Sequence, residues 1–317
     1  MSTASRLNWL VFLALGFMWG SSYLWIKIGV ESLPPFTLIA LRLFFGFLVV
    51  ATVVLLFREP LPRSPRQYGH LLVMSIVNVV VPFALITWGE QSIDSSLATI
   101  LNATVPLLVI VLAPQFLPDE PLTLNRIVGL AVGFAGVIVL FAPDLVNVGD
   151  GDLSGELALM GSSVSYAAGN VYARRNVRGL RPMIPALFQV AFALLISTGL
   201  ALVFEAPIGR IAPEPLAWVA VIWLGVIGSG FAYLAYFRLL RDWGATRTSM
   251  VAYLLPIVGI SLGALAGEPV TVPRLVGTGL IIAGVALVNS RYWAKRLWGR
   301  TQTAAPASVG VGGEPRG

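Results

Sequence analysis

The stretch that decides the fold is EPLTLNRIVGLAVGFAGVIVL, residues 120–140, because it occurs a second time as EPVTVPRLVGTGLIIAGVALV, residues 268–288. Nine positions are identical at a constant offset of 148 residues, beginning with Glu120 and Glu268. Each copy consists of an acidic residue and a proline, a short polar step, and an apolar run that contains glycines. Self-similarity at about half the chain length indicates a duplicated architecture.

The composition is that of a protein which crosses a membrane several times. Of the 317 residues, 57% are hydrophobic and 11% are charged, and the mean hydropathy is +0.84. Soluble domains carry about 25% charged residues. The pI near 10.0 does not indicate a nucleic-acid partner, because the basic residues lie between apolar runs and form no patch. The chain has no cysteine, so we expect neither disulfides nor a thiolate metal site, and we expect no cofactor.

Ten apolar runs are long enough, or nearly so, to cross about 30 Å of hydrocarbon. Each should be a helix, because a segment in lipid must satisfy its own backbone hydrogen bonds. The runs lie near residues 8–28, 36–57, 69–89, 95–116, 123–142, 153–173, 184–204, 216–238, 246–266 and 273–293. The remaining segment, 294–317, is rich in Ala, Gly and Pro towards its end and is expected to be a disordered cytoplasmic tail.

The basic residues predict the orientation of the chain. If the N-terminus is cytoplasmic, 17 of the 21 Lys and Arg residues fall on the cytoplasmic side. Lys27, Arg210 and Arg274 fall on the outer side, and Arg42 falls within a span. We therefore expect both termini in the cytoplasm.

The duplication extends over the whole set of spans. The first span, from Trp19 to Lys27, matches the sixth, from Tyr166 to Arg174, and Pro106 matches Pro256. The repeats are therefore residues 8–143 and 153–293, with five spans each. Five is odd, so the two copies should lie upside down relative to one another, which places a shared site near the membrane midplane between them. The fifth and tenth spans, rich in glycine and poor in polar residues, should pack at the periphery.

Several of these motifs resemble the EamA repeats of the drug/metabolite transporter superfamily. The resemblance is carried by WGSSY at 19–23, ALR at 40–42, NATVP at 102–106, the Glu120–Pro121 pair and GLAVGFAGV at 129–137. It covers about residues 8–293 in two copies. It implies a ten-helix bacterial inner-membrane carrier, often an exporter of amino acids or related metabolites. The second copy departs from the first at Gln189, which stands where the first copy has Arg42.

A carrier needs polar side chains near the midplane that replace the hydration of its solute. Aromatic residues at span ends usually anchor a helix at the membrane interface, and a membrane Ser or Thr usually bonds its own helix. Deep aromatic residues and amides are less easily explained in this way. The predicted substrate contacts are Trp19, Tyr23, Arg42, Asn78, Trp88, Asn102, Tyr166, Asn170, Tyr233 and Tyr253.

Arg42 is the cation placed deepest in a span, about six residues or roughly 9 Å past its outer boundary. Three interpretations remain open. The side chain could snorkel to the interface, pair with Glu90 at the outer end of the third span, or attract a carboxylate of the solute.

The sequence favours a carrier over other classes of membrane protein. An intramembrane enzyme needs clustered acids, histidines or an activated nucleophile, and the chain has one histidine, no cysteine and no catalytic motif, so we expect no catalytic residues. A channel tends to show a ring of filter residues, and none is visible.

We expect a transporter that works by alternating access and exports amino acids, preferably hydrophobic or aromatic ones. The alternative is a permease for drugs or other small metabolites, including uptake. Its partners would be a small-molecule substrate and the lipid bilayer, and we expect a monomer, with a dimer as the alternative.

Overall fold

The computed structural model of the protein describes residues 3–117, 124–146, 153–177, 179–206, 214–243 and 248–298. All regular secondary structure in these ranges is helical. The predicted all-α, polytopic fold is confirmed.

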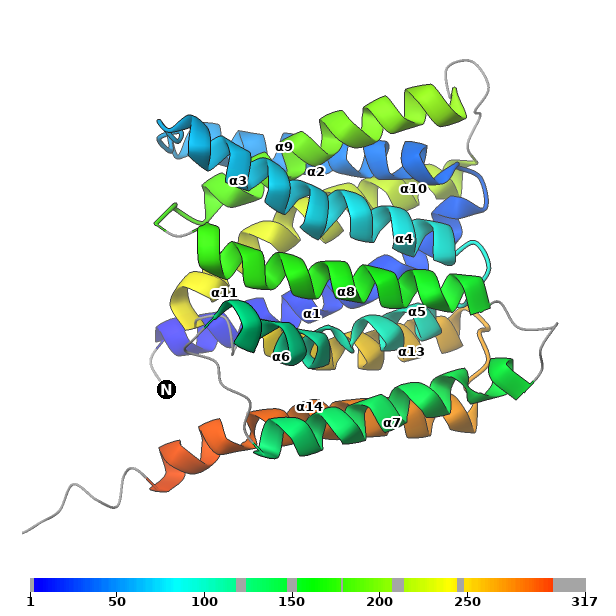
Figure 1. The fold of residues 1–317 in the computed structure, drawn as a ribbon. Helices are drawn as coiled ribbons and strands as arrows, with labels where there is room; N and C mark the ends of the chain where they lie inside the picture. The colour runs from blue at the N-terminus through cyan, green and yellow to red at the C-terminus, as the bar shows by residue number, and fades with distance from the viewer. Residues whose placement is uncertain are drawn as a thin grey trace, which may run out of the picture.

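Within the described ranges the helices join end to end into ten rods that run side by side (Figure 1). The first half consists of α1 (Thr3–Val30), α2 (Pro35–Leu56), α3 (Pro65–Ser75) with η1 (Ile76–Val80) and α4 (Val81–Gly89), α5 (Ser95–Asn102) with α6 (Val105–Phe116), and α7 (Leu124–Val146). The second half consists of α8 (Leu153–Asn176), α9 (Met183–Leu200) with η2 (Ala201–Glu205), α10 (Pro215–Ile222) with η3 (Trp223–Phe231) and α11 (Ala232–Trp243), η4 (Ser249–Tyr253) with α13 (Leu254–Leu265), and α14 (Val272–Trp298).

Six of these rods are long and apolar enough to span a membrane, and three more contain shorter apolar helices, Leu124–Leu140, Val251–Leu265 and Val272–Gly284. The remaining rod, α8, carries several serines as well as Asn170 and Arg174. It packs against α4, α5, α6 and α7, so protein surrounds much of it and its buried polar residues avoid lipid.

The pair α7 and α14 lies along one side of the bundle, at the bottom of the view in Figure 1. The two helices pack closely through glycines, as expected for peripheral spans. A Cβ atom at Gly284 would lie 2.5 Å from the carbonyl oxygen of Gly129, and one at Gly136 would lie 2.7 Å from that of Gly277. These glycines therefore face the partner helix.

Packing between the halves follows a twofold pattern. α2 packs against α9, and α7 packs against α14. The contact of α1 with α13 is matched by the contact of α6 with α8, and that of α4 with α8 is matched by α1 with α10 and α11. Exchanging each rod for its counterpart five places along therefore reproduces these contacts. Figure 1 also shows α1 and α8 running in opposite directions.

Several rods are interrupted where the sequence places prolines or polar residues. α5 and α6 are separated by a turn at Ala103–Thr104, just before Pro106, and the matching Pro256 follows the 3-10 turn η4. Proline has no N–H for the helix ladder, which explains breaks at both places. The wider π-helical turns η1 and η3 contain Asn78 and Ser229, and such turns frequently lie at functional sites.

The helical structure at the C-terminal end extends past the predicted last span. Helix α14 continues to Trp298, so residues 294–298 are helical and do not belong to the expected tail. Residues 299–317 lie outside the described residues, as do Glu120–Thr123 at the start of the repeated stretch.

Candidate substrate-binding site

A cavity of about 860 Å³ lies between the two halves. At one end its lining includes arginines at the start of α7, the end of α8, the start of α9 and the end of α11, and this end is called the basic end below. The ends of these helices lie at the left of Figure 1, where the chain begins. The basic end reaches the surface, because the side chains of Arg181 and Arg241 are 68% and 62% exposed. At the other end the cavity stops at the buried residues Tyr23, Ile26 and Ile86.

Eight of the ten predicted substrate contacts line this cavity, and they come from both halves. They are Trp19, Tyr23, Arg42, Asn78, Asn102, Tyr166, Asn170 and Tyr233.

Trp88 and Tyr253 are not among the residues that line the cavity. Trp88 is 49% exposed; it follows Ile86 by two positions, which is about 200° around an α-helix, so it points away from the face that lines the cavity. Tyr253 ends the 3-10 turn η4 and packs against the core. With three residues per turn, Ala252 and Leu255 share the face towards the cavity, and Tyr253 lies a third of a turn away.

Arg42 is held at the inner part of the cavity by two contacts. Its Nε donates a hydrogen bond of 2.9 Å to Oγ of Ser229, and its guanidinium carbon lies 4.0 Å from the centroid of the Phe83 ring. The side chain is buried, so it does not snorkel to the interface. Among the described residues no ion pair joins Arg42 to Glu90. The geometry is that of a fixed cation, which suits the binding of an anion.

Ser229 reaches Arg42 because α2 and η3 lie unusually close together. A Cβ atom at Gly46 would lie 2.9 Å from Cβ of Ser229, and one at Gly225 would lie 2.7 Å from the carbonyl oxygen of Arg42. Small residues on both helices therefore set the position of the guanidinium.

The wall of the cavity is largely aromatic. The Trp19 ring lies 6.4 Å from the Tyr233 ring and 5.4 Å from the Tyr236 ring, measured between centroids. Tyr23 and Tyr166 line the same space. Such a wall suits an apolar or aromatic part of a solute, because offset and edge-on ring contacts add to the burial of apolar area.

Two amide groups at the cavity have an atom without a hydrogen-bond partner among the described residues. These atoms are Oδ1 of Asn78 and Nδ2 of Asn102, and both are buried. The Asn78 side chain lies directly over Gly169 of α8, which leaves no room for a Cβ atom there. Buried polar groups normally have a partner, but protein covers both atoms here, so a solute could reach them only after neighbouring helices shift.

Comparison with known proteins identifies the chain. The sequence profile of the EamA-like transporter family matches residues 7–142 and again 153–290. The chain belongs to the EamA-like transporter family. This EamA-like transporter is 31% identical over 289 residues to the uncharacterized inner membrane transporter YedA of Escherichia coli K12, covering 87% of this chain and 88% of YedA. It is 24% identical over 283 residues to the uncharacterized transporter YoaV of Bacillus subtilis, covering 88% of this chain and 95% of YoaV.

The fold also matches a solved structure. One crystal structure aligns with a TM-score of 0.68 at 24% sequence identity, covering 94% of this chain and all of that one. The predicted membership of the drug/metabolite transporter superfamily is confirmed, and the protein is a multi-pass membrane transporter.

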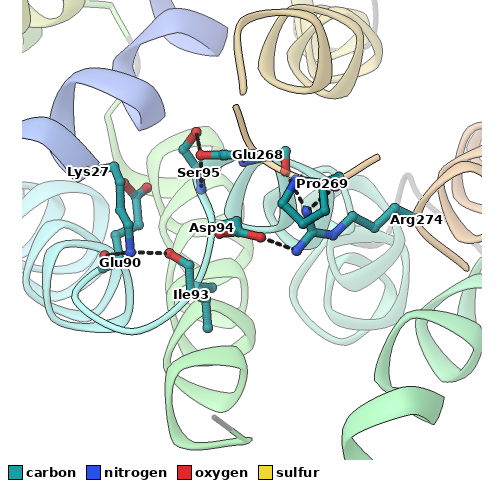
Figure 2. Close-up of polar contacts among 9 residues, drawn as sticks. Lys27, Glu90, Ile93, Asp94, Ser95, Glu268, Pro269 and Arg274 are labelled. Carbon is teal, nitrogen blue, oxygen red and sulfur yellow. Dashed lines mark hydrogen bonds and ion pairs between the residues drawn. The ribbon is translucent and has the colours of Figure 1, made fainter. Parts of the chain in front are cut away.

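The end of the EamA-like transporter opposite the basic end is closed by polar contacts between the halves (Figure 2). Glu268, in the turn after α13, accepts hydrogen bonds from the backbone N–H groups of Ser95 and Ser96, both 2.9 Å, and from Oγ of Ser95, 2.6 Å. The carboxylate thus caps the N-terminus of α5. Arg274 pairs with Asp94 and also donates to Oγ of Ser96.

A second such contact joins η2, which continues α9, to α2. Glu205 accepts hydrogen bonds of 2.7 Å from the backbone N–H groups of Phe36 and Thr37, and one of 2.6 Å from the Thr37 hydroxyl. Two helices of the first half, α2 and α5, are therefore capped by carboxylates of the second half.

Some residues of the site were not predicted from the sequence. Gln189 lines the cavity and lies against the Tyr233 hydroxyl. Gln189 could have been predicted as a site residue, because it occupies the position in the second repeat that matches Arg42 in the first. Tyr236 could have been found because it follows the predicted Tyr233 by three positions on the same helix face.

Proposed function

We propose that this EamA-like transporter carries small metabolites across the bacterial inner membrane by alternating access, and that its principal substrates are amino acids with hydrophobic or aromatic side chains, which it exports. The observation that carries the proposal is the cavity between the halves, open at one end, closed at the other, and containing a buried arginine at its inner part. A site that is reachable from one side at a time is what alternating access requires.

The arrangement of the rods supports alternation between two states. The packing pattern is twofold, and α1 and α8 run in opposite directions. In an inverted repeat, each half can adopt the conformation of the other half, which closes the open end and opens the closed one. The proposed repeats are residues 8–143 and 153–293.

The charge distribution supports an orientation with both termini in the cytoplasm. The basic end of the cavity carries Arg126, Arg174, Arg181 and Arg241, and basic segments remain on the cytoplasmic side. The open end would then face the cytoplasm, and the end closed by Glu268 and Arg274 would be the outer end. The name of YedA places that relative in the inner membrane, which fits the same location here.

Three features of the cavity fit an amino acid. Arg42 can bind the carboxylate, and Oδ1 of Asn78, which has no hydrogen-bond partner among the described residues, could accept a hydrogen bond from the ammonium group once a shift of α8 uncovers it. The wall formed by Trp19, Tyr166 and Tyr233 can contact an apolar side chain.

A permease for drugs or other small metabolites, including uptake, is the second candidate. The volume of about 860 Å³ lies in the upper part of the range of roughly 300–1,000 Å³ for small-molecule sites. The charged residues that line the cavity are arginines. Both observations favour a larger organic anion. We expect a monomer as the transporting unit, with a dimer as the alternative.

Counterflow in proteoliposomes tests the proposal. Vesicles loaded with unlabelled phenylalanine should accumulate external labelled phenylalanine transiently, and the rate should saturate with concentration. A panel of glycine, lysine, phenylalanine and an aromatic carboxylate without an ammonium group separates the two candidates. Flux that rises linearly with concentration for every solute would contradict a carrier, and saturable flux of the carboxylate alone would favour the second candidate.

A further inference from the structure

Glu90 is a buried carboxyl group that the proposed substrate site does not use. It follows the last residue of α4 at the closed end and is 0% exposed. Both of its carboxyl oxygens are buried and have no hydrogen-bond partner among the described residues. The nearby Lys27 donates hydrogen bonds of 2.9 Å to the backbone carbonyl oxygens of Glu90 and Ile93, so its bonds go to the end of the helix and not to the carboxyl group (Figure 2).

The charged and titratable groups around Glu90 come from every neighbouring element. Lys27 and Tyr23 lie on α1, Arg42 lies on α2, and Glu268 lies on the turn after α13. On α8, which packs against α4, the acidic residue at this end is the buried Glu156. Burial raises the pKa of the Glu90 carboxyl well above its ordinary value; Lys27 acts in the opposite direction, and the charge of Glu268 raises the pKa further.

We propose that Glu90 is a proton-binding site that is occupied while the outer end is closed and is emptied when that end opens. The inference rests on the alternating access proposed above. An ionised carboxylate that is buried without hydrogen bonds is strongly unfavourable, whereas the neutral acid is tolerated. Opening the outer end would admit water to the turn between α4 and α5, and the solvated carboxyl group would then release its proton to the outer solution.

The sign of the pH dependence follows from linkage. The closed state binds the proton more tightly than the open state, so lowering the pH favours closure, and raising the pH favours opening. Closure should depend on pH in the range above the ordinary pKa of Glu, which is about 4.3.

Glu268, at the same end, acts in a different pH range. Burial of Glu268 is outweighed by the hydrogen bonds from Ser95 and Ser96, which lower the pKa of its carboxyl group. Its protonation would weaken closure only below about pH 4. The single histidine, His70, lies on α3 and contacts the Tyr172 hydroxyl at 2.7 Å. Glu268 is therefore not the group that governs closure between about pH 5 and 8, and the glutamine variants below separate Glu90 from the buried Glu156.

The absence of cysteine allows two spin labels to be attached without background. Cysteines at Gln91 and Ala266, which are exposed in the turns after α4 and α13, place one label on each side of the outer end. The distance distribution, measured by double electron–electron resonance on the full-length protein in nanodiscs, should shift from long to short as the pH falls from 8 to 5. The ratio of open to closed should change by up to tenfold per pH unit.

Glu90→Gln, which imitates the neutral acid, should give the short distance at every pH. Glu31→Gln, which changes an exposed acid at the same end, should leave the pH dependence intact. A single distance at every pH in the spin-labelled protein that retains Glu90 and Glu31 would overturn the proposal. Loss of the pH dependence in Glu156→Gln, with the dependence retained in Glu90→Gln, would also overturn it. Because the distances require no substrate, failure here is distinguishable from failure of the transport proposal, which the counterflow assay measures.

Discussion

Arg42 and Gln189 line the same cavity from α2 and α9, two helices that pack against each other, although 147 positions separate the two residues in the chain. They occupy matching places in the two repeats. The duplicated chain therefore has a pair of facing polar positions at its centre, with a positive charge on one side only. A symmetric scaffold thus presents an asymmetric site.

Arg42→Gln makes the two positions alike and should retain the fold, because glutamine already occupies the matching position. Binding of a carboxylate substrate should weaken by about 10- to 150-fold, since hydrogen bonds to a charged group contribute about 1.5–3 kcal/mol. Isothermal titration of the purified protein measures the effect, with Arg66→Gln, an exposed cation outside the cavity, as the control. Early melting with unchanged affinity would instead make Arg42 a structural residue.

Ser229→Ala removes the acceptor for Nε of Arg42 and should weaken carboxylate binding less than Arg42→Gln does. The guanidinium keeps its charge and its contact with Phe83, but its orientation is no longer fixed. The same titration should show a several-fold loss of affinity. An effect larger than that of Arg42→Gln would mean that Ser229 contacts the substrate itself.

Gly284→Ala should destabilise the pairing of α7 and α14, because the added Cβ atom would lie 2.5 Å from the backbone of Gly129 and of Gly133. Overpacking of this kind costs about 1–3 kcal/mol. Gly279→Ala on the same helix is the matched control, since no atom lies within 4 Å of the added Cβ. Thermal unfolding in detergent should show a lower midpoint for Gly284→Ala alone. Equal midpoints would show that the two helices separate readily.

Glu268→Gln should weaken closure of the outer end at neutral pH, because the cap on α5 loses its charge. Hydrogen bonds hold the pKa of the Glu268 carboxyl below its ordinary value, so its contribution is full above about pH 4.3 and is lost as the pH falls through the lower value of the closed state. The difference in melting midpoint between the variant and the wild type should accordingly be greatest near pH 7 and should vanish in acid. A difference that grew on acidification would contradict this assignment.

The sequence predicted those parts of the site that depend on span position and duplication. Trp19 and Tyr166 occupy matching deep positions, and both line the cavity. Trp88 could not be placed correctly from depth alone, because depth says nothing about which face of a helix points inwards. The burial of Glu90 was also invisible, since a residue at the end of a span looks solvated until the neighbouring elements are packed around it.

Irregular helical turns account for most of the features of the site that could not be predicted from the sequence. The π-helical turns around Asn78 and Ser229 and the 3-10 turn before Pro256 rotate the side chains that follow them. Their positions depend on tertiary packing, and a periodicity of 3.6 residues does not reveal them.

The most direct test of alternating access uses a cysteine in place of Ile26, which is 3% exposed and lines the inner part of the cavity. A membrane-impermeant thiol reagent is added to one face of sealed vesicles at a time, with the exposed Glu31→Cys as the marker for the outer face. At an acidic pH, which favours closure of the outer end, the cysteine should react from the cytoplasmic face at rest and from the outer face as well during substrate turnover. A cross-link between cysteines at Gln91 and Ala266 should abolish only the outer reaction. A cysteine that reacts from the outer face alone, or that keeps reacting from the outer face after the cross-link, would contradict the account.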